Sequence, residues 1–369
     1  MAVLLMVGYV VIAYAWGSVG HRIINSKAMI QLPASMSVYH ADSVFITQHA
    51  SDADARKVSS DTSMYAEAPR HFLDLDDYPN WQHLSHSFDT LVMLYGWQRV
   101  KDNGTLPWTT AWLVDSLAHQ IARGDVMVPQ TMADIGHYVG DAHQPLHCTA
   151  NYDGGLSVPS QRGIHSRYES TMLGTFQSLI TIQPDSVHYI ADPLEYAFSY
   201  IYYSNLHVDS ILQADTYAKT VSGWTGSGSA PSSYYDALWE KTGSFTEQLF
   251  QNATVDLASM WYTAWVNAQL ISTGVPVPKV FPDIFELQQN YPNPFNPSTT
   301  IRFTIKQTAS VRVKVYDAAG REMATLMNSR MEPGEHQVLW NASGAASGIY
   351  IVRLDAGAFT QTRKMLLLR

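Results

Sequence analysis

Two pairs of side chains, each a His followed by an acid four residues later, are the part of this sequence best suited to chemistry. His137 and Asp141 lie in the run HYVGDAHQPLH, and His165 and Glu169 lie in HSRYE. Residues spaced i, i+4 project from one face of a helix. With His147 between the pairs, five imidazole or carboxylate groups fall within thirty-three residues. Because these groups are the usual zinc ligands outside cysteine sites, the pattern favours a metal site over structural histidines.

Further residues that could bind a metal lie upstream of these pairs. They are Asp52 and Asp54 in HASDADARK, and His71, Asp74, Asp76 and Asp77 in EAPRHFLDLDD. Taken singly, each is typical of a solvated loop acid or a capping residue. Nine residues are the best candidate ligands, which would suit two or three metals with one bridging carboxylate: Trp16, His21, Asp54, His71, His137, Asp141, His147, His165 and Glu169.

The first fifteen residues are apolar and end in Ala13-Tyr14-Ala15, the small-x-small pattern of a signal-peptidase site. The stretch is too short to span a bilayer as a helix. Cleavage after Ala15 would leave Trp16 as the mature N-terminus, where the α-amino group and first carbonyl could chelate a metal. The usual positive n-region is missing, so an uncleaved leader is the alternative interpretation.

Composition fits an exported globular protein. A chain of 369 residues can hold two domains with real cores, and 46% hydrophobic with 12% aromatic residues argues against disorder. The single cysteine, Cys148, excludes an internal disulfide framework and a cysteine-based zinc site. It could be a soft ligand, although packing as a small apolar residue is the favoured interpretation.

Charge is divided unevenly along the chain. The first 278 residues contain twelve Lys and Arg against 25 Asp and Glu, whereas the remainder contains eleven against seven. An acidic N-terminal region suits cation binding and lacks the basic surface of a nucleic-acid-binding protein.

Apolar periodicity predicts an all-α domain over residues 16–274, with metal ligands pointing into a helical bundle. A Pro-rich linker is expected over 275–283, and short alternating runs predict a small all-β sandwich over 284–369. The expected helices are Phe88–Val100, Thr109–Arg123, Pro129–His147, Pro193–Leu212 and Ser233–Leu270. The expected strands are Thr300–Ile305, Ser310–Tyr316, Glu335–Trp340, Gly348–Leu354 and Thr360–Leu367.

The tail resembles the C-terminal sorting domain of proteins exported by the bacterial type IX secretion system. YPNPFNPSTTI, NASGAASGIYIVRL and the closing KMLLLR carry the resemblance. It implies contact with the secretion machinery and passage through the periplasm of a Gram-negative bacterium, followed by release or attachment to the cell surface. An ordinary accessory β-sandwich is the alternative.

The helical region resembles the superfamily of zinc-dependent phospholipases C and single-strand-specific zinc nucleases. The resemblance rests on the order of the candidate ligands and on the HF-x-D, H-x-x-GD and QP-x-H motifs. It implies three zinc ions per chain. One is bound by Trp16 and His21, a second by Asp54, His71 and His137, and a third by His147, His165 and Glu169, while Asp141 bridges the first two. Asp54 is preferred to Asp52 because it aligns better.

Such a site is expected to cleave phosphodiester bonds. Two zinc ions bridged by a carboxylate can share and deprotonate a water, and a third can bind a phosphoryl oxygen and stabilise the developing charge. Asp54, Asp74 and Asp141 are therefore the predicted catalytic residues. Asp74 is expected to orient water or a His ligand, and a role in a helix or turn is equally compatible with its sequence context.

The substrate is predicted to be a phospholipid, with single-stranded nucleic acid as the alternative. HSRYE, the acidic balance and the missing disulfides favour the phospholipases, whereas APRHFLDLDD and GDAHQPLH look like the nucleases. A zinc-stabilised surface-binding protein without turnover is a second alternative. No stable protein partner is predicted.

Overall fold

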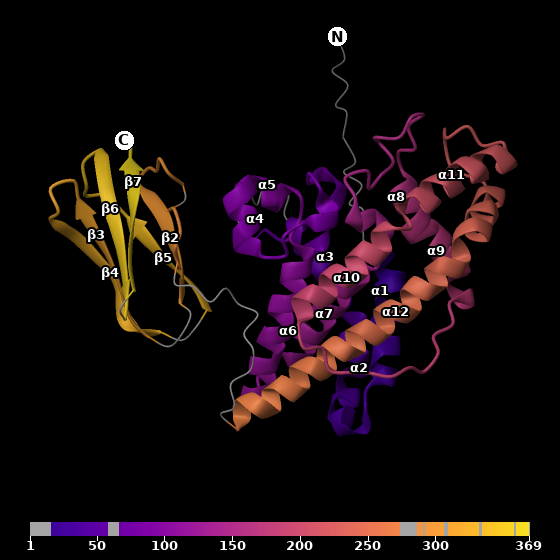
Figure 1. The fold of residues 1–369 in the computed structure, drawn as a ribbon, viewed down its shortest axis with the longest axis horizontal. Helices are drawn as coiled ribbons and strands as arrows, with labels where there is room; N and C mark the ends of the chain where they lie inside the picture. The colour runs from indigo at the N-terminus through magenta and orange to yellow at the C-terminus, as the bar shows by residue number, and fades with distance from the viewer. Residues whose placement is uncertain are drawn as a thin grey trace, which may run out of the picture. The chain divides into compact units, whose positions relative to one another are not determined.

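The computed structural model of the protein describes residues 16–57, 66–273, 286–290, 292–305, 309–331, 334–357 and 359–368. The predicted signal peptide 1–15 and linker 275–283 lie outside these residues. The chain divides into two compact units, Met1–Val280 and Phe281–Arg369 (Figure 1). Between residues 16 and 273, the described residues form helices and turns without a strand, as the periodicity predicts.

Helix α7 is the centre of the helical unit, with twelve of its fifteen residues buried. It contacts helices at both ends of the sequence, including α1 and α12. The longer helices are α1 (Gly17–Gln31), α4 (Phe88–Tyr95), α6 (Leu106–Arg123), α7 (Val128–Ala142), α10 (Pro193–Asn205), α11 (Val208–Ser222) and α12 (Ser232–Ser272). The short ones are η1 (Ala34–Asp42), α2 (Ser43–Gln48), α3 (Asp52–Ala55), η2 (Ala68–His71), η3 (Leu75–Asp77), η4 (Trp81–His83), α5 (Trp97–Asp102), η5 (Pro145–Cys148), α8 (Ile164–Ser166), η6 (Arg167–Met172), α9 (Leu173–Phe176) and η7 (Gln177–Leu179).

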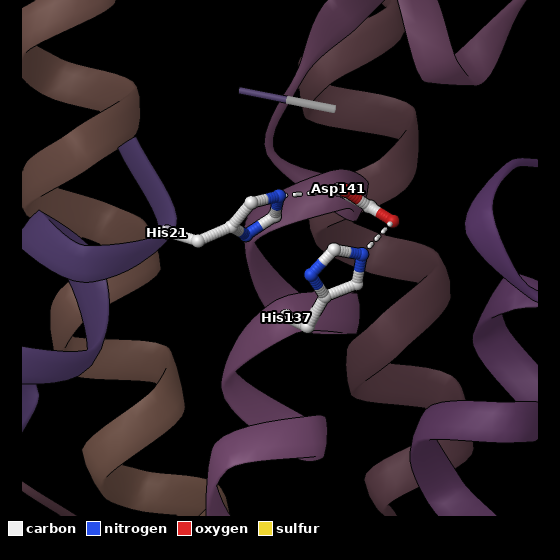
Figure 2. Close-up of side chains that lie close together, drawn as sticks. All are labelled: His21, His137 and Asp141. Atoms are coloured by element: carbon white, nitrogen blue, oxygen red, sulfur yellow. Dashed lines mark ion pairs between the residues drawn. The ribbon is translucent and has the colours of Figure 1, made fainter. Parts of the chain in front are cut away.

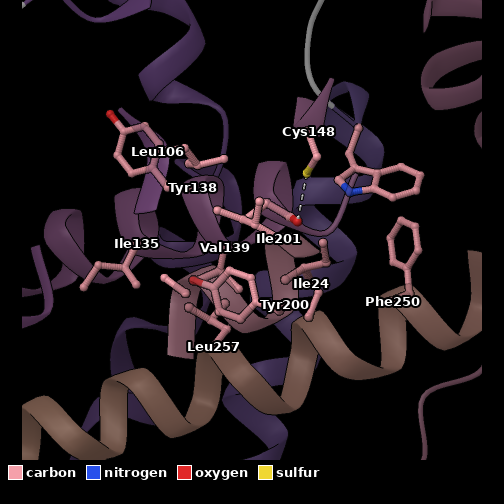
Figure 3. Packing of buried hydrophobic residues seen from close by; sticks show 14 of the residues in the cluster. Ile24, Leu106, Ile135, Tyr138, Val139, Cys148, Tyr200, Ile201, Phe250 and Leu257 are labelled. Atoms are coloured by element: carbon pink, nitrogen blue, oxygen red, sulfur yellow. Dashed lines mark hydrogen bonds between the residues drawn. The ribbon is translucent and has the colours of Figure 1, made fainter. Parts of the chain in front are cut away.

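One apolar core holds this unit together. The 41-residue helix α12 runs along the bundle (Figure 1) and packs against α1, α6, α7 and α11. Figure 3 shows Ile24 of α1, Ile201 of α10, and Phe250 and Leu257 of α12 gathered in this core. Cys148 is among them, fully buried, with its thiol 3.6 Å from the carbonyl oxygen of Ala142. It therefore packs as a small apolar residue and lies outside the clusters of potential metal ligands.

The predicted helical segments are correct in type but several are too long. The segment from Phe88 is broken at Gly96, whose φ of 81° is strained for other residues. The segment from Pro129 ends at Ala142, and a separate short helix, η5, follows. The segment from Pro193 divides into α10 and α11. Apolar spacing continues across these breaks because both pieces face the same core.

The C-terminal unit consists of two antiparallel sheets, ordered β1-β2-β5 and β4-β3-β6-β7. On β3, Val311, Val313 and Val315 are fully buried and alternate with less buried residues, as expected for a strand with one face in a core. Buried residues of both sheets form one apolar cluster. The strands are β1 (Glu286–Leu287), β2 (Ser298–Ile305), β3 (Ala309–Asp317), β4 (Glu322–Met331), β5 (Gly334–Asn341), β6 (Gly348–Ala356) and β7 (Phe359–Leu367).

The five predicted strands correspond to β2, β3, β5, β6 and β7. Two strands were not predicted, the two-residue β1 and the ten-residue edge strand β4. Strand β4 contains no fully buried residue, so the apolar alternation that identifies a half-buried strand is weak. In neither unit does a described helix combine the length and apolar character required to cross a membrane.

Candidate metal centre

Helix α7 positions His137 and Asp141 one turn apart, and both are fully buried. His21 reaches them from α1. The close approach of the two helices depends on Gly140, because a Cβ atom there would lie 2.9 Å from His21 Nδ1. The glycine of the HYVGD run therefore has a steric role beside the candidate ligands.

The first group of potential ligands comprises His21, His137 and Asp141. Figure 2 shows both imidazole rings directed at the carboxylate. His21 Nε2 is 3.4 Å from Asp141 Oδ1, and His137 Nε2 is 3.3 Å from Asp141 Oδ2. The two rings stack with centroids 3.9 Å apart.

The second group comprises Asp54 of α3, His71 at the end of η2, and His137. His137 Nε2 is 3.0 Å from His71 Nδ1 and 3.6 Å from Asp54 Oδ1. Asp141 also contributes, since its Oδ2 is 2.9 Å from His71 Nδ1. Asp141 thus directs one oxygen at His21 and the other at His71 and His137, which is the geometry of a bridging carboxylate.

The third group comprises His147, His165 and Glu169. His165 and Glu169 do not lie on one regular α-helix, because α8 ends at Ser166 and residues 167–172 form a π-helix. Both side chains nevertheless meet, with His165 Nε2 at 2.8 Å and His147 Nε2 at 3.6 Å from Glu169 Oε2. The side chains of His147 and His165 are 7% and 8% exposed, more than any other histidine in the three groups. Solvent therefore reaches the centre most readily here.

The donor atoms fit zinc in type and in spacing. Zinc–nitrogen distances of 2.0 to 2.1 Å place tetrahedral ligand atoms roughly 3.3 Å apart. Within the three groups the facing atoms lie between 2.8 and 3.7 Å apart. Several of these fully buried atoms make no hydrogen bond, which is costly unless a cation is bound. They are His21 Nδ1 and Nε2, Asp54 Oδ2, His71 Nε2, Asp141 Oδ1, His165 Nδ1 and Glu169 Oε1.

Backbone carbonyls set the tautomers of two histidines. The Nδ1 atoms of His137 and His147 lie 2.9 Å from the carbonyl oxygen of Ala50 and 2.5 Å from that of His71. A carbonyl only accepts, so each Nδ1 carries a proton and each Nε2 of the neutral ring presents a lone pair to the centre. Lone pairs and carboxylate oxygens then converge on the same points, an arrangement that requires a bound cation or additional protons.

The pKa shifts reflect this convergence. Burial alone would lower the pKa of His137, but Asp141 and Asp54 outweigh it and raise that pKa to about 8. Burial opposes ionisation of Asp141, yet His137 and His147 hold its pKa well below the usual range. Burial and the neighbouring His137 lower the pKa of His21. In the absence of metal, a proton on His137 partly neutralises the carboxylates.

The remaining predicted acids lie outside the three groups. Asp52 pairs with His49 at 2.6 Å, so the centre receives Asp54 rather than its neighbour. Asp76 accepts hydrogen bonds from Thr149 and Ala150, and Asp77 pairs with Arg99. These three acids therefore stabilise loops or form ion pairs at the surface, away from the candidate ligands.

Asp74 is half-buried close to the centre. Burial and the charges of Asp76 and Asp77 raise its pKa to about 7. Among the described residues its carboxylate makes no hydrogen bond to the three groups, and Nδ1 of His147 is oriented by a carbonyl instead. The predicted role of Asp74, orienting water or a His ligand, stays a prediction.

The backbone nitrogen of Trp16 contacts a carboxylate of the third group. Its backbone nitrogen donates to Glu169 Oε2 at 3.1 Å, and its fully buried indole ring packs against Tyr168 and Phe250. The assignment of Trp16 to the ion of His21, which the resemblance implies, stays a prediction.

Three residues at the centre were missed by sequence reasoning. Lys57 Nζ is 2.6 Å from Asp54 Oδ1, and Gln144 donates to Glu169 Oε2 at 3.0 Å. Glu67 Oε1 is 3.5 Å from His71 Nε2. Each has a local signal in hindsight: Lys57 and Glu67 lie within one turn of a ligand along the chain, and Gln144 begins the QP-x-H run.

One surface hollow lies away from this centre. It has a volume of about 580 Å³ and is lined by residues of α1, η1 and α2, including Ile30, His40 and Val44. None of its lining residues belongs to the three groups.

Comparison with known proteins bears on the C-terminal unit alone. No curated protein matches the chain. Residues 289–368 match the family described as the secretion system C-terminal sorting domain, and the match covers none of the helical unit. This part of the chain is a type IX secretion sorting domain, which indicates interaction with the secretion machinery and a secreted or cell-surface location.

Proposed function

We propose that the helical unit is a secreted trinuclear zinc hydrolase that cleaves phosphodiester bonds, with phospholipids as substrates. The observation that carries the proposal is the presence of three buried His and carboxylate groups, two of them joined by Asp141. A merely structural cluster would be expected to pair its buried polar atoms with one another. The C-terminal unit is proposed to be a small β-sandwich that serves export.

Zinc, when bound, supplies a Lewis acid that lowers the pKa of a water molecule and polarises the phosphoryl group. The residues around it hold and orient the reactants. Asp54 Oδ2 is buried without a hydrogen-bond partner and can accept a proton from an approaching water. No side-chain nucleophile is required.

A phospholipid is favoured because the basic residues near the centre are already paired. Arg56 pairs with Asp134 at 3.0 Å, Lys57 with Asp54 at 2.6 Å, and Arg70 with Glu67 at 4.0 Å. They therefore offer no free basic track for a polyphosphate chain. A phospholipid carries a single phosphodiester and needs no such track.

Single-stranded nucleic acid is the second candidate, and Tyr152 is the observation that supports it. Its ring lies edge-on to His165 with centroids 5.7 Å apart, and it is 53% exposed. An exposed aromatic ring beside the most accessible group could stack a base. The same ring could equally contact a lipid, so activity must distinguish the two.

The test is an activity panel on the zinc-loaded protein. A soluble short-chain phosphatidylcholine should be cleaved at the glycerol–phosphate bond, with weak dependence on salt and complete loss after chelation. Cleavage of single-stranded DNA or RNA without lipid turnover would show that the protein is a nuclease and would overturn the choice of phospholipid as substrate. Binding of three zinc ions without turnover of either substrate would favour the non-catalytic alternative.

A further inference from the structure

Glu67 is a carboxylate at the outer edge of the second group, on the side of His71 away from the other ligands. His71 Nδ1 is hydrogen-bonded to Asp141 Oδ2 at 2.9 Å. Its Nε2 faces Glu67 Oε1 at 3.5 Å, makes no hydrogen bond among the described residues, and has this carboxylate as its nearest charged neighbour on that side. The ring is 2% exposed, so water cannot readily replace either partner. One imidazole is therefore held between two carboxylates from different parts of the fold.

The number of protons on His71 makes this arrangement informative. A neutral imidazole has one N–H and one lone pair, so it can donate to only one of the two carboxylates. Donation to Asp141 would leave a lone pair facing Glu67. Donation to Glu67 leaves the Nδ1 lone pair among Asp141, Asp54 and His137, where a metal ion can bind it.

Glu67 is also tied to the other ligand-bearing segments. It accepts a hydrogen bond from the hydroxyl of Tyr138, which follows His137 on α7. It pairs with Arg56, which lies two residues after Asp54, at 3.4 Å. Arg56 in turn pairs with Asp134 on α7. Through these contacts one carboxylate joins the segments that supply all three ligands of the second group.

We propose that Glu67 is a positioning residue that accepts the Nε2–H of His71 and so directs the Nδ1 lone pair of that ring toward a zinc ion. The assignment rests on the proposed zinc-binding role of the centre. Glu67 does not touch substrate or metal. Its anionic charge makes the imidazole a stronger ligand, and its links to Tyr138 and Arg56 fix where that ligand stands.

The test measures zinc affinity of the purified full-length protein by competition with a chelator. Glu67→Gln keeps the size and one acceptor oxygen but removes the charge. We expect about 10- to 100-fold weaker binding at one site, with the remaining zinc bound as in the unchanged protein. Glu67→Ala removes the acceptor as well and should weaken the same site further. The visible spectrum of the cobalt-loaded protein should change with Glu67→Gln, because the field of one imidazole ligand changes.

Two further variants separate positioning from general stability. Tyr138→Phe removes one donor to Glu67 and should weaken the same site in a folded protein. Glu195→Gln is the matched control, because Glu195 pairs with His86 at 2.8 Å on the surface, and its zinc affinity should be unchanged. Unchanged affinity in both Glu67→Gln and Tyr138→Phe would overturn the proposal while leaving the proposed function intact. If the protein without any substitution binds no zinc, both this proposal and the proposed function are overturned.

Discussion

Asp141 places its two carboxylate oxygens against histidines from different segments, which no other acid in the centre does. Oδ1 faces His21, and Oδ2 faces His71 and His137. Replacing a residue that binds one metal should release one ion, whereas replacing a residue shared by two metals should weaken the binding of both. That difference can be measured by counting zinc.

Replacing Asp141 by Asn keeps the shape of the side chain but removes the negative charge between two cations. We expect two zinc ions to weaken together, whereas His147→Ala should release about one ion per chain, because His147 belongs to the third group alone. Metal analysis of folded, dialysed protein gives both numbers. Loss of a single ion in each variant would contradict the bridge.

Trp16 provides a second test at the scale of one atom. Its backbone nitrogen lies 3.1 Å from Glu169 Oε2, inside the core. If this nitrogen is a free amine in the mature protein, it can bind a metal, whereas a peptide nitrogen has no available lone pair. Protein that begins at Trp16 should therefore bind about one zinc more than protein that begins at Ala15. Equal zinc content in the two folded proteins would refute a role for the amine.

At the scale of elements, the segment that carries His165 and Glu169 is held in place by an ion pair with helix α11. Arg167 lies between His165 and Glu169 in sequence and pairs with the fully buried Asp215 of α11 at 2.9 Å. Asp215 also accepts from Lys219, Gln161 and Tyr234. The π-helix is thus fixed to α11 and α12 by one carboxylate.

Asp215→Asn should lower the free energy of unfolding by about 3 kcal/mol, because it leaves the largely buried Arg167 without a counter-charge. Urea denaturation monitored by circular dichroism measures the change. Glu240→Gln is the control, since Glu240 pairs with Lys241 on the surface and should leave the midpoint unchanged. A variant as stable as the unchanged protein would show that the anchor is dispensable.

The lowered pKa of Asp215 also allows a prediction of how the free energy of unfolding depends on pH. Burial would raise the pKa of Asp215, but hydrogen bonds from Lys219 and Tyr234 and the charge of Arg167 lower it below its ordinary value of 3.8. Its contribution is therefore present above pH 4 and is lost as the pH falls through its folded pKa. Unfolding midpoints of metal-free protein between pH 6 and pH 3 should fall more steeply than those of Asp215→Asn. Parallel curves would contradict this assignment.

Local spacing was enough to predict some parts of the centre and not others. The pairing of His137 with Asp141 follows from helical periodicity, whereas the steric role of Gly140 emerges only from the structure, in the close approach of α1. The contact between Glu67 and Tyr138 joins residues 71 positions apart and leaves no periodic signal. The π-helix that carries Glu169 was also beyond prediction, because it depends on anchoring by a distant helix.

At the scale of the whole molecule, the two units are expected to work independently. The C-terminal unit has its own apolar core and matches a sorting domain, and none of the described clusters of potential metal ligands lies in it. Deleting residues 279–369 should leave substrate turnover by the purified protein unchanged while the protein accumulates in the periplasm. Cell fractionation and activity assays check the two halves separately. Loss of turnover in a folded helical unit would show that the tail contributes to the site.

Cys148 has a consequence for a protein that travels through oxidising surroundings. It is the only cysteine of the chain, and its thiol is fully buried. Burial, together with the charges of Asp74 and Asp141, raises the pKa of that thiol well above the usual range, so little thiolate is available to react. The folded protein is thereby protected from cross-linking to its neighbours through a mixed disulfide. The rate at which a thiol reagent labels Cys148 would record how often the helical core opens.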